Sequence, residues 1–380
     1  MKVMIAVTHL LGAGHLSRAA TLARAFAHSG HEVSLLSGGR AAPHLDMSGF
    51  SLLQAPPLAS DGINFARLLD DTGGLAEESY LKRRTDRMVR ALQETAPDVL
   101  ITELFPFGRR ALSGEFLALL EAAKSLPTKP RVYASIRDIL APPSKPSKAD
   151  RAEEILSTYY DGVLVHSDPA ITPLDASWPV SSAVADMLNY TGYVAPHPVY
   201  ANRDGDGAGE VIVSAGGGSV GNALFECAIQ AAEQSDLTWR LLVGGEDKVE
   251  RINKLNSKIL TENVIVESVR PDFRDMLARA AASVSMCGYN TALDLLQTGL
   301  PGVIIPFDDG GEVEQTLRAE SLRALPSIEV ITSSDLYPER LAVALTHVLT
   351  SGHRVTDGLK MDGAGQSVRI VERDVHGLSS

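Results

Sequence analysis

Residues 286–320 read MCGYNTALDLLQTGLPGVIIPFDDGGEVEQTLRAE, and this stretch decides the fold. An apolar strand ends at Cys287, a short turn follows, and Thr291 opens a helix. The next apolar run, GVIIPF at 302–307, is again short and bounded by turn residues. Strands separated by helices pair in parallel and take helices on both faces. The stretch therefore predicts one repeat of an open α/β sheet.

The same alternation runs through both halves of the chain. In the first half a helix is expected over 15–30, and strands are expected at 2–7, 31–37, 98–104, 131–136 and 162–167. In the second half a helix is expected from about 222, and strands at 210–216, 239–245, 263–268, 282–287, 302–307 and 328–332. Between the halves, ANRDGDGAGE (201–210) lacks apolar periodicity and is interpreted as a linker.

The domain organisation predicted from this alternation is two Rossmann-like domains with parallel sheets, over 1–200 and 201–360. The tail over 361–380 is expected to form one more helix, which could pack back on the first domain. Ligands bind beyond the carboxyl ends of the strands in such sheets. Two domains of this kind would face each other across a cleft, so the residues just after each strand are the candidates for function.

Composition narrows the classes of function. The chain has 380 residues, a formal net charge of −12 and only two cysteines. This charge argues against a general nucleic-acid surface, and the cysteines fit neither a disulfide framework nor a zinc site. The N-terminus does not have the pattern of a signal peptide, and no apolar run is long enough to span a bilayer. We expect a cytoplasmic protein without a transmembrane segment, which leaves room for peripheral contact with a membrane.

Two turns of the second domain carry candidate binding residues. The turn SAGGGSVG (214–221) lies between a strand and a helix, where backbone N–H groups and the helix dipole can hold a phosphate. Its alternative is a plain tight turn. Asp294, three residues after Thr291, could accept hydrogen bonds from ribose hydroxyls. Spacing alone favours the alternative of a capping box between Thr291 and Asp294.

The second half resembles the nucleotide-sugar-binding domain of GT-B glycosyltransferases, in particular glycosyltransferase family 28. The resemblance rests on Asn290-Thr291-x-x-Asp294, Gly299-x-Pro301, a strand ending at Pro306, and Glu314-Gln315. It implies a GT-B fold and a transferase that uses a nucleotide-diphospho-sugar, with UDP as the expected nucleotide. The family usually has Glu at the position of Asp294, so the residues alone do not identify uridine as the base.

The resemblance also implies a set of donor-binding residues. Asp294 would bind the ribose, Glu314 and Gln315 the sugar, and Arg270 lies in the segment that meets the base. The diphosphate would be held by the two turns. The donor-binding candidates are Gly14, Ser214, Gly216, Gly217, Gly218, Ser219, Arg270, Gly288, Asn290, Thr291, Asp294, Glu314 and Gln315.

In the first domain the stretch GAGHLSR (12–18) follows the first strand. It lacks the third glycine of a dinucleotide fingerprint, and no acid ends the second strand, so a nicotinamide enzyme is disfavoured. His15 at a helix N-terminus favours a neutral imidazole, which could take the proton from an acceptor hydroxyl. Its alternative role is to hydrogen-bond the loop. Glu103 and Asp138 could orient His15 or serve as the base themselves.

Several functional alternatives remain open. The loop GxGHxxR also resembles UDP-sugar hydrolases of the pseudaminic acid pathway, in which the histidine activates water. A 2-epimerase on the same fold and a non-catalytic nucleotide-sugar-binding protein are further alternatives. Extra length around 40–95 and 139–160 favours a first domain that binds an acceptor, hence a transferase. Beyond the nucleotide-sugar donor and an unknown acceptor, no cofactor, metal or nucleic-acid partner is expected.

Overall fold

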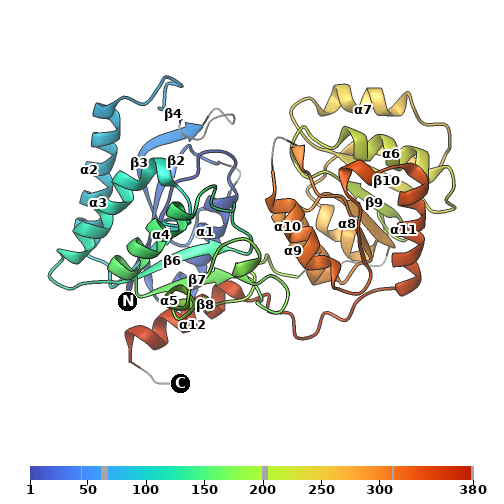
Figure 1. The fold of residues 1–380 in the computed structure, drawn as a ribbon. Coiled ribbons are helices and arrows are strands. Elements are labelled where there is room, and N and C mark those ends of the chain that lie inside the picture. Colours follow the sequence, from blue (N-terminus) through green and yellow to red (C-terminus); the bar gives the residue numbers. More distant parts are fainter. Residues whose placement is uncertain (44, 61–66, 199–203, 310–311, 378–380) are drawn as a thin grey trace. The chain divides into compact units, whose positions relative to one another are not determined.

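The computed structural model describes residues 1–43, 45–60, 67–198, 204–309 and 312–377, and it divides into two compact units (Figure 1). The first unit comprises Met1–Val194 and Lys360–Ser380, and the second comprises Ala195–Leu359. Each unit is a mostly parallel sheet covered by helices, which confirms the α/β class predicted from the sequence. The expected border at residue 200 lies outside the described residues.

The first unit contains an eight-stranded sheet in the order β4-β3-β2-β1-β5-β6-β7-β8. All neighbours pair in parallel except β3 and β4, which are antiparallel. The strands are β1 (Lys2–Val7), β2 (Glu32–Gly39), β3 (Ser51–Ser60), β4 (Leu68–Leu69), β5 (Val99–Glu103), β6 (Arg131–Arg137), β7 (Gly162–His166) and β8 (Leu188–Tyr190). The helices are α1 (Gly14–His28), α2 (Glu78–Thr95), α3 (Ser113–Lys124), α4 (Pro146–Tyr159), α5 (Ser182–Ala185) and α12 (Gly363–Val375), with short 3-10 turns η1 (Arg110–Leu112) and η2 (Leu174–Ala176).

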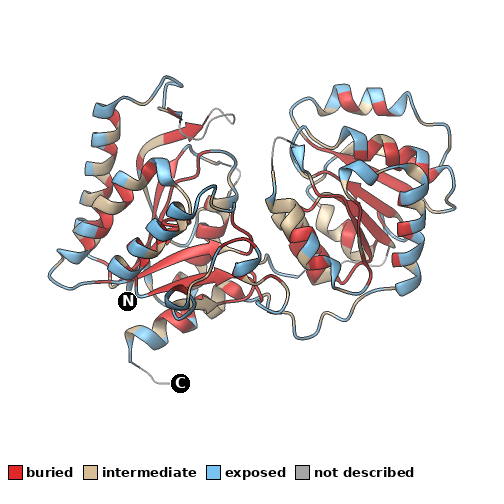
Figure 2. Cartoon of the chain, in the orientation of Figure 1, coloured by how far each residue is buried: buried red, intermediate tan, exposed pale blue. Residues whose placement is uncertain are grey.

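Strand β1 shows why this sheet is covered on both faces. Met4 and Ala6 belong to one apolar cluster, and Val3, Ile5 and Val7 belong to the other. Successive side chains of a strand point to opposite faces, so an uninterrupted apolar run needs helices on both sides. Figure 2 shows the result, with buried strands inside and helices exposed only on their outer faces.

The second unit contains a six-stranded parallel sheet in the order β11-β10-β9-β12-β13-β14. Its strands are β9 (Val211–Ser214), β10 (Trp239–Val243), β11 (Val264–Ser268), β12 (Ala282–Ser285), β13 (Gly302–Ile304) and β14 (Ile328–Val330). Its helices are α6 (Asn222–Ala232), α7 (Lys248–Asn256), α8 (Phe273–Arg279), α9 (Tyr289–Thr298), α10 (Glu314–Arg323) and α11 (Pro338–Ser351), with the 3-10 turn η4 (Ser333–Asp335).

Two segments differ from the sequence-based expectation or extend it. The described part of the expected linker, 204–210, is packed on the second unit: Arg279 donates to the Asp206 carbonyl at 2.7 Å, and Gly209 N–H donates to the Arg279 carbonyl at 3.1 Å. At the other end of the chain, α12 packs on α1, and its Val368 and Val371 join the cluster beneath α1 (Figure 1). Among the described residues, no helix is both long and apolar enough to cross a bilayer.

Candidate active site

Each of the two sheets reverses its direction of winding at one point, and several of the predicted residues lie at these points. In the first sheet β1 lies beside β5, and in the second sheet β9 lies beside β12. Connections leave these neighbouring strands toward opposite faces, which opens a crevice at their carboxyl ends where ligands bind. His15 follows β1 and Glu103 ends β5, while the turn over 215–221 follows β9 and Gly288 follows β12.

In the first unit, His15 is the second residue of α1 and contacts a buried carboxylate. Gly12 has a φ of +63°, a left-handed conformation that glycine adopts readily, and it brings the chain into the helix. His15 Nδ1 lies 2.9 Å from Glu103 Oε1 and 3.1 Å from Arg18 Nη2. Arg18 also donates to Glu103 Oε1. The structure therefore brings together His15 and Glu103, two of the three predicted catalytic candidates.

Burial and charge set the protonation of this pair. Burial alone would raise the pKa of Glu103, but Arg18, His15 and Ser135 outweigh it and hold this pKa well below its usual range. Burial lowers the pKa of His15 to about 4, although Glu103 opposes the shift and Arg18 adds to it. At neutral pH a neutral imidazole thus lies against an ionised carboxylate. Such a pair can accept a proton at His15 and stabilise the imidazolium that forms.

The other first-unit candidates take different positions. Asp138 follows β6 and is buried, and His15 Nδ1 lies against Glu103 and Arg18. Arg18, one turn along α1 from His15, is buried against Glu103. Gly14 begins α1, and a Cβ added there would meet no atom within 4 Å.

In the second unit, the turn after β9 leaves space for a ligand. Gly216 has a φ of +81°, so glycine is favoured there by the backbone itself. The backbone of Gly217 and Gly218 is not left-handed, so it does not require glycine there. A Cβ at Gly217 would meet nothing within 4 Å, and a Cβ at Gly218 would meet only Val220 at 3.9 Å. Helix α6 begins after Gly221 with no side-chain cap. The first backbone N–H groups of α6 and its helix dipole can therefore bind an anion.

The turn after β9 packs against residues that the sequence analysis did not identify. A Cβ at Gly244 would lie 2.5 Å from the Gly216 carbonyl oxygen, so the turn after β10 packs closely on the turn after β9. Arg251, buried on α7, donates to the carbonyl oxygens of Gly244 and Val220 and thereby ties the two turns together. The dipeptide Gly244-Gly245 was a sequence signal for this contact, but it was assigned to the strand.

Helix α9 corrects the expected geometry of Asp294. The helix begins at Tyr289 with Gly288 as its N-cap and no side-chain cap, so the capping box between Thr291 and Asp294 is wrong. Asp294 lies in the second turn, not the first, and accepts a hydrogen bond from Arg274 Nε at 2.7 Å. Burial raises the pKa of Asp294, and Arg274 opposes this shift. Asp294 and Arg274 both line a cavity of about 310 Å³.

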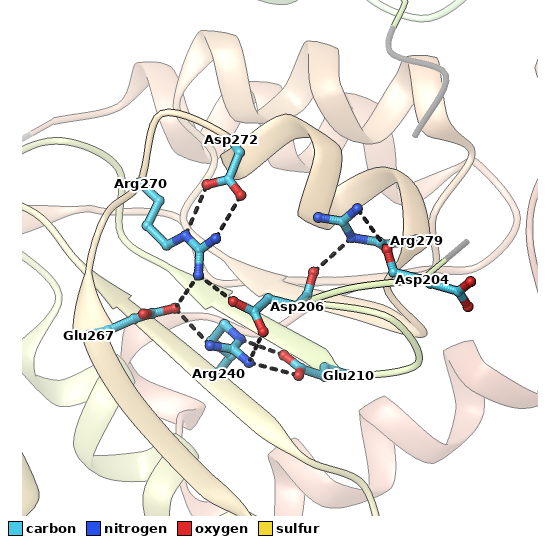
Figure 3. A network of polar contacts seen from close by, with 8 residues as sticks. All are labelled: Asp204, Asp206, Glu210, Arg240, Glu267, Arg270, Asp272 and Arg279. Carbon is cyan, nitrogen blue, oxygen red and sulfur yellow. Dashed lines mark hydrogen bonds and ion pairs between the residues drawn. The ribbon is translucent and has the colours of Figure 1, made fainter. Parts of the chain in front are cut away.

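Arg270, expected near the base, lies in a network of ion pairs (Figure 3). It pairs with Asp272 at 2.7 Å and with Asp206 at 2.6 Å, and Glu267 lies 3.6 Å away. Arg240 contacts two of these acids, Asp206 and Glu267, and also pairs with Glu210. The network fixes the segment 204–210 to the second unit.

The remaining donor candidates occupy the strand ends and the start of α10. Ser214 Oγ accepts a hydrogen bond from Gly216 N–H at 3.2 Å, and Ser219 donates to Asp247 at 2.5 Å. Gln315 accepts from Phe307 N–H at 3.2 Å, and Glu314 begins α10. Asn290 and Thr291 lie in the first turn of α9. The loop before Glu314 includes residues 310 and 311, which lie outside the described residues.

Comparison with solved structures defines the class of fold. The chain is similar to MurG of Acinetobacter baumannii, with a TM-score of 0.64, 16% identity, and coverage of 98% of this chain and 99% of that one. It is also similar to the glycotransferase of kitacinnamycin, with a TM-score of 0.66, 16% identity, and coverage of 100% and 99%. The fold is GT-B, as predicted.

The sequence of the second half of the chain matches a family model. Residues 212–368 match the glycosyltransferase family 28 C-terminal domain, so the predicted resemblance to this family is confirmed for that part of the chain. Two relatives are UDP-N-acetylglucosamine--N-acetylmuramyl-(pentapeptide) pyrophosphoryl-undecaprenol N-acetylglucosamine transferases. The Rhizobium etli protein is 26% identical over 168 residues, which is 43% of this chain and 44% of that protein. The Brucella anthropi protein is 31% identical over 146 residues, 37% of this chain and 38% of that protein. The matched stretches span less than half of these relatives.

Proposed function

We propose that the chain is a glycosyltransferase that moves a sugar from a nucleotide-diphospho-sugar, with UDP as the nucleotide, to an acceptor hydroxyl. The observation that carries the proposal is the neutral His15 imidazole held against the ionised Glu103 at the winding reversal of a GT-B unit. His15 would remove the proton from the acceptor oxygen as that oxygen attacks the anomeric carbon.

The second unit would hold the donor. The open space at Gly217 and Gly218 fits a diphosphate, which the free N–H groups at the start of α6 would stabilise without a metal ion. Asp294 would accept from the ribose hydroxyls, and Glu314 and Gln315 would bind the sugar. The names of the relatives specify a UDP-linked N-acetylglucosamine donor and an undecaprenol-linked acceptor. A lipid-linked acceptor is therefore the first class of acceptor to test, with the enzyme acting from the cytoplasm.

The hydrolase is the second candidate, because the same loop geometry would let His15 activate water. One assay separates the two. The protein is incubated with UDP-, GDP- and dTDP-sugars, each with and without an undecaprenyl-diphosphate-linked saccharide or a lipid extract. We expect release of UDP only when the acceptor is present. Release without it would establish hydrolysis, and binding of UDP with no turnover under any condition would leave a binding protein.

A variant of the base completes the test. His15→Asn keeps a hydrogen-bonding side chain but removes the basic nitrogen. We expect turnover to fall by roughly 10²–10⁴, the usual contribution of a positioned acid–base group. The affinity for UDP should stay within about twofold, because the donor is assigned to the other unit. Full activity of the variant would show that His15 only orders the loop.

A further inference from the structure

Polar side chains from five neighbouring strands form one continuous row along the carboxyl edge of the first sheet. His15 follows β1, Glu103 ends β5, Ser135 lies in β6, His166 ends β7 and Thr191 follows β8. These strands are consecutive in the sheet. Beyond His15, every member of the row is at most 2% exposed. A buried polar group without a hydrogen-bond partner costs folding free energy. Each contact in the row should therefore contain one hydrogen, carried by the donor and facing a lone pair of the acceptor.

The distribution starts at the carboxylate. Glu103 is ionised and can only accept hydrogen bonds. His15 Nδ1 lies 2.9 Å from Glu103 Oε1, and a lone pair there would face a negatively charged oxygen. Nδ1 must therefore carry the hydrogen and donate it to Glu103. Arg18 can only donate, and its Nη2 lies 3.1 Å from His15 Nδ1 but closer to Glu103 Oε1; the ionised oxygen is the stronger acceptor, so the hydrogen of Arg18 is directed to the carboxylate. A neutral ring has one such hydrogen, so the lone pair is on Nε2.

The same accounting fixes the rest of the row. Ser135 Oγ lies 2.6 Å from Glu103 Oε2 and must donate its single hydrogen to it. Its oxygen is then the acceptor for His166 Nε2, 3.0 Å away, so the hydrogen of His166 is on Nε2. The lone pair of His166 Nδ1 then faces Thr191 Oγ1 at 2.8 Å, and the single hydrogen of Thr191 is shared between this nitrogen and the Gly192 carbonyl oxygen, also 2.8 Å away. Burial lowers the pKa of His166 to about 3, so its ring is neutral.

We propose that Ser135 and His166 are positioning residues that act through Glu103 to hold His15 in the tautomer with a hydrogen on Nδ1 and the lone pair on Nε2. The hydrogen bonds then point from His166 through Ser135 toward Glu103 and meet the one from His15 there. The catalytic meaning of this arrangement rests on the proposed function, but the tautomer itself does not. Neither residue would touch the substrate.

The charged groups around the row support the assignment. Arg18 on α1, Arg109 in the loop after β5, and Glu103 act on His15, and Arg18 and Glu103 act on His166. The two arginines disfavour an imidazolium, and Glu103 attracts a ring hydrogen. If Oε2 loses the hydrogen from Ser135, the carboxylate can rotate, and the preference of His15 for the Nδ1 hydrogen weakens.

The test reads the tautomer directly. Protein labelled with ¹⁵N at histidine is examined by long-range ¹H–¹⁵N correlation at neutral pH, and His15 is assigned from its missing signals in His15→Asn. The unmodified protein should show one tautomer, with the hydrogen on Nδ1. In Ser135→Ala and His166→Leu, signals of the other tautomer should appear. His166→Gln, whose amide can still donate to Ser135, should restore the original pattern at least in part.

Turnover and a matched control complete the experiment. Both disruptive variants should lose about tenfold in kcat at unchanged UDP affinity, the lower end of what residues that orient an imidazole contribute. Tyr160→Phe removes a different buried hydrogen bond of this unit, to Thr102 at 2.8 Å, and should leave the tautomer and kcat as they are. An unchanged tautomer in the variants that fold overturns the inference, whatever happens to activity. A changed tautomer in a protein that transfers no sugar would uphold the row and refute the proposed function instead.

Discussion

Glu103→Gln tests the pair at the centre of the candidate site. The amide keeps the shape of the side chain but removes its charge, while Arg18 stays buried with a side chain only 5% exposed. Breaking a buried ion pair by removing one partner costs about 3–5 kcal/mol, because the other charge is left uncompensated. For a unit of this size, 1 kcal/mol shifts Tm by about 2–4 °C, so we expect a loss of about 6–20 °C.

The loss should also depend on pH. The folded-state pKa of Glu103 lies below its usual value of 4.5, so the ionised group adds stability above that pH and loses it as the pH falls toward the folded-state pKa. The difference in Tm between the two proteins should therefore be full at pH 7 and shrink below about pH 4.5. Turnover at pH 7 should fall by about 10²–10⁴, since the imidazolium formed at His15 loses its carboxylate.

Glu115→Gln is the matched control. Glu115 pairs with Arg84, which is completely buried, at 2.6 Å in the same unit, so its loss should cost comparable stability. It does not contact His15, and turnover measured well below its melting temperature should hold. Scanning calorimetry at pH 7 and pH 4 and UDP release give the two readouts. Equal losses of activity in both variants would show that Glu103 acts on stability alone, and unchanged turnover in Glu103→Gln would refute the assigned pair.

Three further predictions follow from the geometry. Gly217→Ala should leave Tm intact, because a Cβ there meets no atom, yet weaken UDP binding at least about tenfold if a phosphate lies against the turn. The control is Gly114→Ala, a position in α3 where a Cβ also meets no atom, and it should leave UDP binding unchanged. Equal UDP affinity in the two variants would show that no phosphate binds at this turn. Asp294→Ala should weaken UDP binding in calorimetry by about 1–3 kcal/mol through lost hydrogen bonds to a charged group, and an unchanged affinity would leave Asp294 as a structural partner of Arg274. Folding lowers the pKa of His166 from 6.5 to about 3, so between these values the unfolded state binds more protons and stability falls as the pH drops. His166→Gln should reduce this loss of stability, measured in urea melts at pH 7 and pH 4.5. An equal loss in both proteins would contradict the buried neutral ring.

The sequence predicted the strands well where burial on both faces made them uniformly apolar. The expected strands of both units are present, most with ends shifted by one to three residues. Strand β3 was missed because SLLQAPPLAS contains two prolines and lies toward the edge of the sheet, where the apolar pattern is weaker. Helix α7 was missed because its exposed face is polar, with few apolar residues to mark a period.

The candidate site was predicted only as far as strand ends mark it. His15 and Glu103 could be named because each comes at the carboxyl end of a strand or just beyond it, and the sheet order brings those ends together. Arg274 could not be found, since its contact with Asp294 joins two helices and leaves no spacing in the sequence. Ser135 and His166 were not distinguishable as partners, because their contact depends on side chains from neighbouring strands.

The position of α12 has a consequence for the order in which the protein can fold during synthesis. The face of the first unit beneath α1 is completed by Val368 and Val371, which follow the whole second unit in the chain. A ribosome adds about 5–20 residues per second, so this apolar face stays uncovered for about 10–30 s while the second unit is made. During that interval the nascent first unit exposes apolar surface, which favours aggregation, even though this unit is synthesised first.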